Sequence, residues 1–118
     1  MKCLSVRQPW ATLLVSGVKT IETRTWGTKY RGPLGIHAGL QIDPYGPWGR
    51  FANGIILPTG ALIGTVELCD CRPMRPEDAE AAACPWRKDL FAWVVTGADV
   101  QCPTPMKGHL GIWEGNIT

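Results

Sequence analysis

Three charged side chains stand close together near the beginning of the sequence. Lys19, Glu22 and Arg24 fall within six residues, directly after Gly17 and just before Trp26. A turn that only reversed the chain would need little beyond the glycine, because glycine adopts positive φ without strain. A cation, an anion and a second cation in one place are instead typical of a site that binds a charged ligand or moves a proton. We therefore expect the chemistry of this chain to be concentrated here.

The elements around these charges place them on one surface. A helical spacing of i, i+3, i+4 and i+7 is set by Trp10, Leu13, Leu14 and Gly17. This spacing predicts a helix of about two turns that begins at Pro9 and ends at Gly17. Residues 20–26 alternate and include β-branched side chains, so we expect a strand there. On a strand Glu22 and Arg24 share one face, and Lys19, at the bend before it, can point back toward them.

A fourth charged residue interrupts the clearest strand of the sequence. Residues 61–69 are almost entirely apolar and alternate in character, with Glu67 in their second half. A buried carboxylate needs a cation or several N–H donors. We therefore expect Lys19 or Arg24 to approach Glu67.

The remaining pattern indicates a small, mainly β protein of the α+β class. Further strands are predicted at residues 2–6, 34–38, 90–95 and 111–114, and a short helix at 76–83. Residues 40–60 and 100–106 are rich in glycine or proline and predict irregular structure, the first a functional or mobile loop. Many short strands with two short helices favour a small mixed β-barrel, and no repeat or boundary divides it. We expect one domain over residues 1–118.

Charge is distributed unevenly along the 118 residues, whose net charge is +2. In residues 1–31, six basic residues against one acidic residue give +5; in residues 32–118, six against nine give −3. Trp10, Trp26 and Tyr30 lie among these early cations, a mixture typical of surfaces that bind phosphates and unstacked bases. The alternative is a solvated basic face above tryptophans that belong to the core. We expect the other tryptophans to pack in the core or loops: Trp48, Trp86, Trp93 and Trp113.

The cysteines and histidines raise the question of a metal. Zinc would need ligands from a set of six side chains: Cys69, Cys71, Cys84, Cys102, His37 and His109. The usual two-residue spacing between paired cysteines is absent, so we expect no metal and no cofactor. We expect reduced, buried thiols that pack as small hydrophobic groups, and histidines that are exposed or hydrogen-bonded.

No signal peptide or membrane segment is expected. The first seven residues carry charges where an apolar segment would run, and no later stretch approaches the roughly 18 apolar residues of a membrane span. These features predict an intracellular, cytoplasmic protein with no membrane partner.

Four segments in order resemble the activating signal cointegrator homology (ASCH) family, which has a PUA-like barrel. They are Leu4–Ala11, Gly17–Arg24, Tyr30–Leu34 and Leu62–Leu68. The second contains the signature of the family, a lysine, glutamate and arginine after a glycine. The similarity covers nearly the whole chain.

The resemblance implies that RNA, another single-stranded nucleic acid, a nucleoside or a nucleotide binds in a cleft beside the first helix. Tryptophans would stack on bases, Glu22 would accept from exocyclic amines, and basic side chains would hold phosphates. The expected binding residues are Arg7, Gln8, Trp10, Lys19, Glu22, Arg24, Trp26, Arg31 and Glu67.

Three alternatives stay open. Some relatives resemble hydrolases that remove the acetyl group of N4-acetylcytidine with a lysine base, a threonine nucleophile three residues later and a glutamate elsewhere; here the threonine position is Glu22. Ribonuclease activity is proposed for other relatives. A hydrolase would therefore use Lys19 with Glu22 or Glu67. The charges could also form a purely structural ion network, and the chain could be a protein-interaction module. RNA, DNA and free nucleoside are not distinguished, nor is the oligomeric state.

Overall fold

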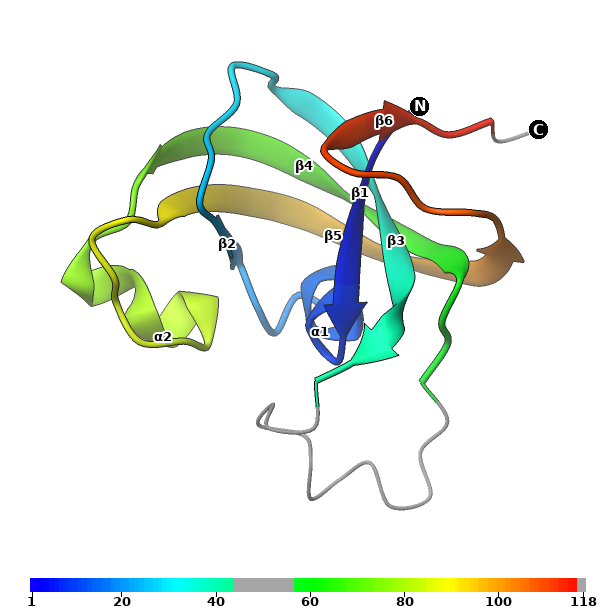
Figure 1. Cartoon of the computed structure of the whole chain (residues 1–118), viewed down its shortest axis with the longest axis horizontal. Coiled ribbons are helices and arrows are strands. Elements are labelled where there is room, and N and C mark those ends of the chain that lie inside the picture. Colours follow the sequence, from blue (N-terminus) through cyan, green and yellow to red (C-terminus); the bar gives the residue numbers. More distant parts are fainter. Residues whose placement is uncertain (44–56, 117–118) are drawn as a thin grey trace.

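Six strands form one mixed sheet in the computed structural model, which describes residues 1–43 and 57–116. The sheet has the order β2-β5-β4-β3-β1-β6 (Figure 1). The elements are β1 (Lys2–Gln8), α1 (Trp10–Val15), β2 (Ile21–Arg24), β3 (Gly32–Ile42), β4 (Ala61–Pro73), a 3-10 turn η1 (Pro76–Asp78), α2 (Ala79–Ala82), β5 (Phe91–Pro105) and β6 (Ile112–Glu114). The predicted fold class, a mainly β, α+β small barrel, is confirmed.

The sheet is strongly curved (Figure 1). Strands β1 and β3 pair in parallel, and the other neighbours pair antiparallel. On β2, Nη2 of Arg24 donates a hydrogen bond of 2.8 Å to the carbonyl oxygen of Ser5 on β1. A side chain therefore connects the edge strand β2 to β1, the neighbour of the other edge strand, and the described residues include no backbone pairing between β1 and β2.

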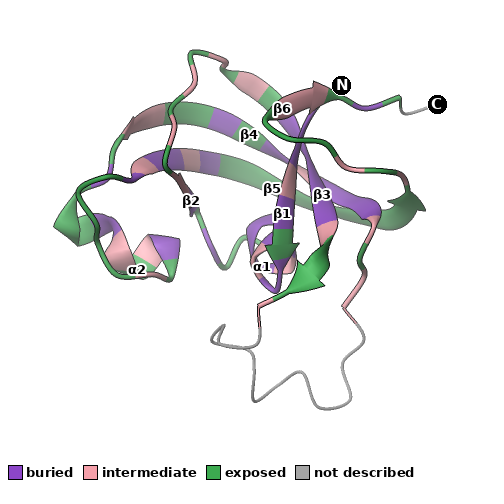
Figure 2. Ribbon diagram, in the orientation of Figure 1, coloured by how far each residue is buried: buried purple, intermediate pink, exposed green. Residues whose placement is uncertain are grey.

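Helix α1 covers the inner face of the curved sheet and supplies part of the core (Figure 2). Its apolar face packs with the buried residues of β1, β3 and β4. The helix ends as predicted, because Gly17 has φ +80° and follows the C-cap residue Ser16. Gly64 lets β4 lie close to its neighbours: a Cβ there would come within 2.3 Å of the Asp99 carbonyl oxygen and 2.8 Å of Val15.

Two strands run into segments for which the sequence predicts irregular structure. Strand β3 continues to Ile42, into the segment 40–60 that we expected to be a loop, and residues 44–56 of that segment lie outside the described residues. Strand β5 includes Pro103 and Pro105, which we expected to interrupt it. Since β2 pairs with Phe91–Val94, the rest of β5 has β4 as its one strand neighbour among the described residues, and an edge tolerates proline.

The helices are short. In the part of the chain that the structure describes, neither has the length and apolar composition that crossing a membrane would require. Helix α2 lies at the side of the molecule away from β6, directly after η1 (Figure 1).

Candidate functional site

A cleft with a volume of about 690 Å³ opens where β1 and β2 approach each other. One wall comes from residues 5–7 of β1 and from Trp10 of α1. A second comes from residues 22–26, and a third from the segment between α2 and β5, including Cys84 and Arg87. Lys19 also lines the cleft, so the charged motif of the sequence lies within it.

Lys19 lies on the floor of this cleft, with 3% of its surface exposed. Its ammonium group donates to the carbonyl oxygen of Ala82 and lies 3.5 Å from Oε1 of Glu22. The same nitrogen lies 5.1 Å from the ring centroid of Trp10, a cation–π distance. A buried cation needs such partners, since desolvation would otherwise oppose folding. The predicted approach of Lys19 to Glu22 is confirmed.

Glu22 is bonded on both of its carboxylate oxygens. While Oε1 faces Lys19, Oε2 accepts from Nε of Arg24 at 3.1 Å and lies 3.1 Å from its Nη2. The two residues share one face of β2, as the strand pattern predicts. With internal cations on both sides, Glu22 does not offer the free acceptor that we expected for an exocyclic amine. We call Lys19, Glu22 and Arg24 the floor cluster.

Two half-buried tryptophans border the floor cluster, and each is anchored on one side. Trp10 carries Lys19 over its ring, and its Nε1 donates to Oδ2 of Asp43 at 3.4 Å. The ring of Trp26 contacts Trp93 edge-on, at 4.8 Å between centroids and 85° between planes. Trp93 is fully buried, as predicted, and so fixes Trp26 against the core. Both tryptophans are among the residues that line the cleft.

Gln8 does not line the cleft, although the sequence analysis placed it there. Its side chain is fully buried: Oε1 accepts from the backbone N–H of Thr12 at 3.0 Å. Nε2 donates to the carbonyl oxygen of Pro58 at 2.8 Å. Gln8 therefore joins the beginning of α1 to the segment before β4, and both polar ends of its amide are used for this.

Glu67 is exposed, so the expectation that it is buried beside Lys19 or Arg24 is wrong. Its neighbours on β4, Val66 and Leu68, face the core. Because side chains alternate across a strand, Glu67 faces the other way, toward solvent. Glu67 does not line the cleft.

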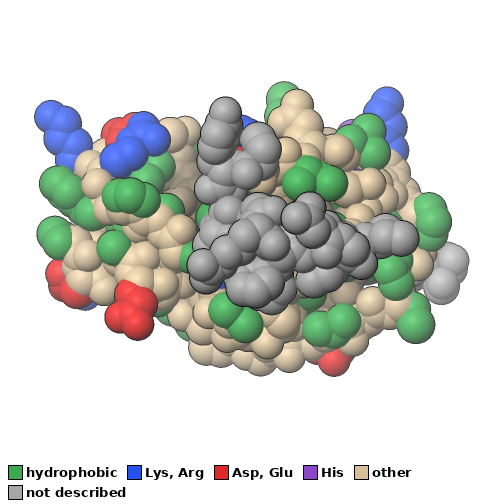
Figure 3. Space-filling view, turned by 90° about the horizontal axis from the view of Figure 1, so that it is seen from below, with side chains coloured by type: hydrophobic (Ala, Val, Ile, Leu, Met, Phe, Trp, Pro, Cys, Tyr) green, Lys and Arg blue, Asp and Glu red, His purple; other side chains and the backbone are tan. Residues whose placement is uncertain are grey.

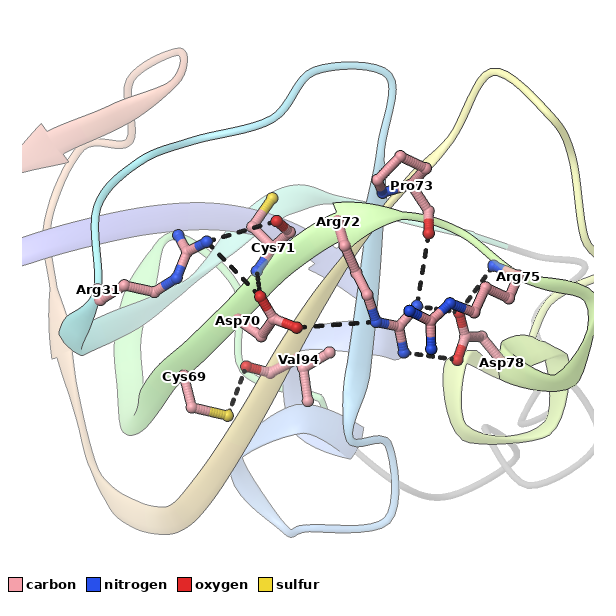
Figure 4. A network of polar contacts seen from close by, with 9 residues as sticks. All are labelled: Arg31, Cys69, Asp70, Cys71, Arg72, Pro73, Arg75, Asp78 and Val94. Carbon is pink, nitrogen blue, oxygen red and sulfur yellow. Dashed lines mark hydrogen bonds and ion pairs between the residues drawn. The ribbon is translucent and has the colours of Figure 1, made fainter.

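Arg31 also lies outside the cleft, in a second group of charges (Figure 4). Its Nη1 donates to the carbonyl oxygens of Thr28 and Tyr30 at 2.9 and 2.8 Å, and its Nη2 lies 3.7 Å from Oδ1 of Asp70. These contacts hold Arg31 along the loop before β3. They explain why a cation near the motif in sequence is not part of the site.

The second group continues from Asp70 to the beginning of α2 (Figure 4). Nε of Arg72 lies 3.7 Å from Asp70, and its two Nη atoms contact the Asp78 carboxylate at 2.6 and 3.0 Å. The Arg75 backbone N–H also donates to Asp78, at 2.8 Å. The Arg72 guanidinium, helped by that N–H, lowers the pKa of Asp78 to about 2. We call Arg31, Asp70, Arg72 and Asp78 the clamp cluster.

The basic surface expected from residues 1–31 is largely neutralised. Four of its six cations are in ion pairs: Lys19 and Arg24 with Glu22, Arg31 with Asp70, and Lys2 with Glu114 at 2.8 Å. The contact raises the pKa of Lys2 and lowers that of Glu114. On the face that Figure 3 shows, the basic side chains lie along the upper edge, with one acidic group beside them, and the other acidic side chains lie lower down.

The histidines and cysteines are not arranged as a metal site. The His37 ring is buried between Oγ of Ser5, at 3.0 Å, and the carbonyl oxygen of Met106, at 2.7 Å, which confirms a hydrogen-bonded histidine. All five cysteines are free, but only Cys3 is buried, so the prediction of buried thiols holds there alone. Burial raises the pKa of that thiol. Residues 1–43 and 57–116 contain no group of three or more potential ligands placed to hold a metal ion.

The third wall of the cleft was missed by the sequence analysis. Arg87 and Cys84 follow a helix of four residues, and nothing in their local sequence indicates which surface they face. Cys84 Sγ lies 3.6 Å from Oγ1 of Thr23 on β2, which brings this wall against the motif. The acceptor for Lys19, the Ala82 carbonyl, is a backbone group and so has no sequence signal at all.

Comparisons with known proteins agree with this fold. The family model described as the ASCH domain matches residues 4–101. Activating signal cointegrator 1 of Mus musculus is 32% identical over 128 residues, and that of Homo sapiens 30% over 131 residues. Each alignment covers 95% of this chain and 22% of the relative, so the chain spans about a fifth of the length of these relatives.

Solved structures show the same architecture. The crystal structure of ASCH from Zymomonas mobilis superposes with a TM-score of 0.62 at 15% identity, covering 88% of this chain and 72% of that one. A point mutant of that protein gives a TM-score of 0.59 at 14% identity, covering 88% and 74%. At these identities the likeness supports the fold alone.

Proposed function

The chain belongs to the ASCH domain family, and on this premise we propose that it binds single-stranded RNA, or a nucleotide, in the cleft between β1 and β2. One observation carries the proposal: the floor cluster has two cations and one carboxylate, so a positive charge remains beside a cavity bordered by two tryptophans. The volume of about 690 Å³ lies within the roughly 300 to 1,000 Å³ of small-molecule sites.

The tryptophans suit this ligand class. Bases of single-stranded RNA stack on aromatic rings, and each stacked base contributes about 1 to 3 kcal/mol. Trp10 is in contact with Lys19 and Trp26 with Trp93, so little further ordering is needed when a base stacks on them. A preordered aromatic surface next to residual positive charge matches a base joined to a phosphate.

A titration with a short fluorescent oligouridylate at about 50 mM and about 200 mM salt tests the proposal. We expect affinity to fall at the higher salt, and Arg7→Gln to weaken binding several-fold because Arg7 is exposed at the cleft. Arg31→Gln is the matched control, since it removes the same charge outside the cleft. Absence of salt-dependent binding, or equal losses in the two variants, would overturn the proposal; the first result would favour a protein-interaction module.

A hydrolase is the alternative, and its candidate residues narrow to Lys19 and Glu22 because Glu67 lies outside the cleft. The contacts of Lys19 with Glu22 and with the Ala82 carbonyl are those of an ammonium donor, which favours binding over a base. Turnover of N4-acetylcytidine or cleavage of RNA, lost in Glu22→Gln, would favour the hydrolase instead.

A further inference from the structure

Arg87 is the cation that the third wall contributes to the cleft, and an internal carboxylate holds it. Its Nε and Nη2 donate to the two oxygens of Asp89 at 3.1 and 2.6 Å. The backbone N–H of Leu90 donates to the carbonyl oxygen of Arg87 at 3.2 Å, which closes a turn over residues 87–90. The base of the side chain is therefore fixed at the cleft, while its guanidinium is engaged with Asp89.

This ion pair differs from those on the floor because it is exposed. The Arg87 and Asp89 side chains are 62% and 50% exposed, against 3% and 10% for Lys19 and Glu22. Exposed pairs contribute little to stability, since water and salt compete with them. An anionic ligand can therefore take the place of Asp89 without disturbing the fold.

The charges of the rest of the cleft favour a ligand that supplies acceptors. Both carboxylates that line it are engaged: Glu22 with two cations, and Asp43 with Nε1 of Trp10. Arg24 still has an amino group, Nη1, without a hydrogen bond among the described residues. The four basic side chains that line the cleft (Arg7, Lys19, Arg24 and Arg87) outnumber its two carboxylates, which favours phosphate oxygens over amino groups of a base.

We propose that Arg87 binds a phosphate of the ligand and that Asp89 occupies the guanidinium in its absence. The planar fork of arginine binds two oxygens of a phosphate in the way it binds two oxygens of a carboxylate. Asp89 is then an internal competitor that lowers the affinity for phosphate. This inference rests on the proposed function and names the phosphate position within it.

The test is a double-mutant cycle, read out by binding of a short fluorescent oligouridylate at two salt concentrations. Asp89→Asn should raise affinity several-fold, because Arg87 no longer has an internal partner. Arg87→Gln should lower it several-fold and reduce the dependence of log affinity on log salt by about 0.7, the value for one phosphate contact on a single strand. In Arg87→Gln/Asp89→Asn the gain from Asp89→Asn should disappear.

Lys88→Gln is the matched control, since it removes the same charge from the same turn outside the cleft. Glu80→Gln likewise matches the charge change of Asp89→Asn. Equal losses in Arg87→Gln and Lys88→Gln, or a gain from Asp89→Asn that persists without Arg87, would overturn the inference and leave the proposed function standing. If the unmodified chain shows no salt-dependent binding, both fail together.

Discussion

The floor cluster and the clamp cluster both pair basic with acidic side chains, but they differ in net charge and in their position relative to the cleft. The clamp joins two arginines to two aspartates and is neutral, and none of its members lines the cleft. The floor joins two cations to one glutamate beside a cavity. Residual charge next to open volume, and not the density of charged residues, is therefore what distinguishes a candidate binding site from a structural network.

The largest effect is expected from Lys19→Met. The change leaves the Ala82 carbonyl without its donor and Glu22 with one cation, so the free energy of unfolding should fall by about 3 to 5 kcal/mol. RNA affinity should fall as well. Urea unfolding measures the loss of stability, and titration with the fluorescent oligouridylate measures the loss of affinity.

A double variant tests whether Lys19 and Glu22 stabilise each other. In Lys19→Met/Glu22→Gln the buried charge left behind is removed too, so the double variant should be more stable than the sum of the single changes implies. Additive losses would show that the floor cluster is not coupled.

Asp78→Asn should have the next largest effect, on stability alone. It weakens both Arg72 contacts, and we expect a loss of about 2 to 3 kcal/mol in urea unfolding. Because the clamp does not line the cleft, RNA affinity of the folded protein should stay within about twofold. If folded Asp78→Asn bound RNA much more weakly than the unmodified chain, the clamp cluster would contribute to binding and the contrast between the two clusters would be wrong.

Acid should weaken the clamp in a defined range of pH. The pKa of Asp78 falls from 3.8 to about 2 on folding, so the unfolded chain takes up the proton first as pH decreases. The stabilisation is complete above about pH 4 and is lost toward pH 2, a change of about 2 kcal/mol. Urea unfolding from pH 5 to 2 should show this decrease in the unmodified chain and a shallower one in Asp78→Asn.

Glu67→Gln should have the smallest effect. Since Glu67 is exposed and outside the cleft, stability should change by less than about 0.5 kcal/mol and RNA affinity should not change. The same measurements check this. A loss of binding would return Glu67 to the site and contradict the cleft described above.

Local signals predicted the first part of the molecule well. Pro9 and Gly17 bound a helix, and the period of β2 puts Glu22 and Arg24 on one face, because these features depend on near neighbours in sequence. Glu67 was misjudged because the whole apolar strand was taken to be buried on both faces, whereas β4 is buried on both faces only over residues 61–64 and has one exposed face at Glu67. That residues 1–118 form one domain stays a prediction.

The third wall could not be predicted, for a physical reason. Arg87 reaches the cleft only because α2 folds back against β2, where the Thr20 backbone N–H donates to the Ala81 carbonyl at 3.2 Å. That contact joins residues far apart in sequence, and no periodicity, cap or turn signal reports it.

The bond between Lys19 and Ala82 joins residues 63 positions apart. A fragment that stopped before Ala82 would contain every letter of the Gly17–Arg24 motif and still lack the backbone oxygen that its lysine requires. The motif therefore depends on a backbone carbonyl that no side chain of the sequence identifies. A shortened version of this protein must include both the motif and the segment that contains Ala82.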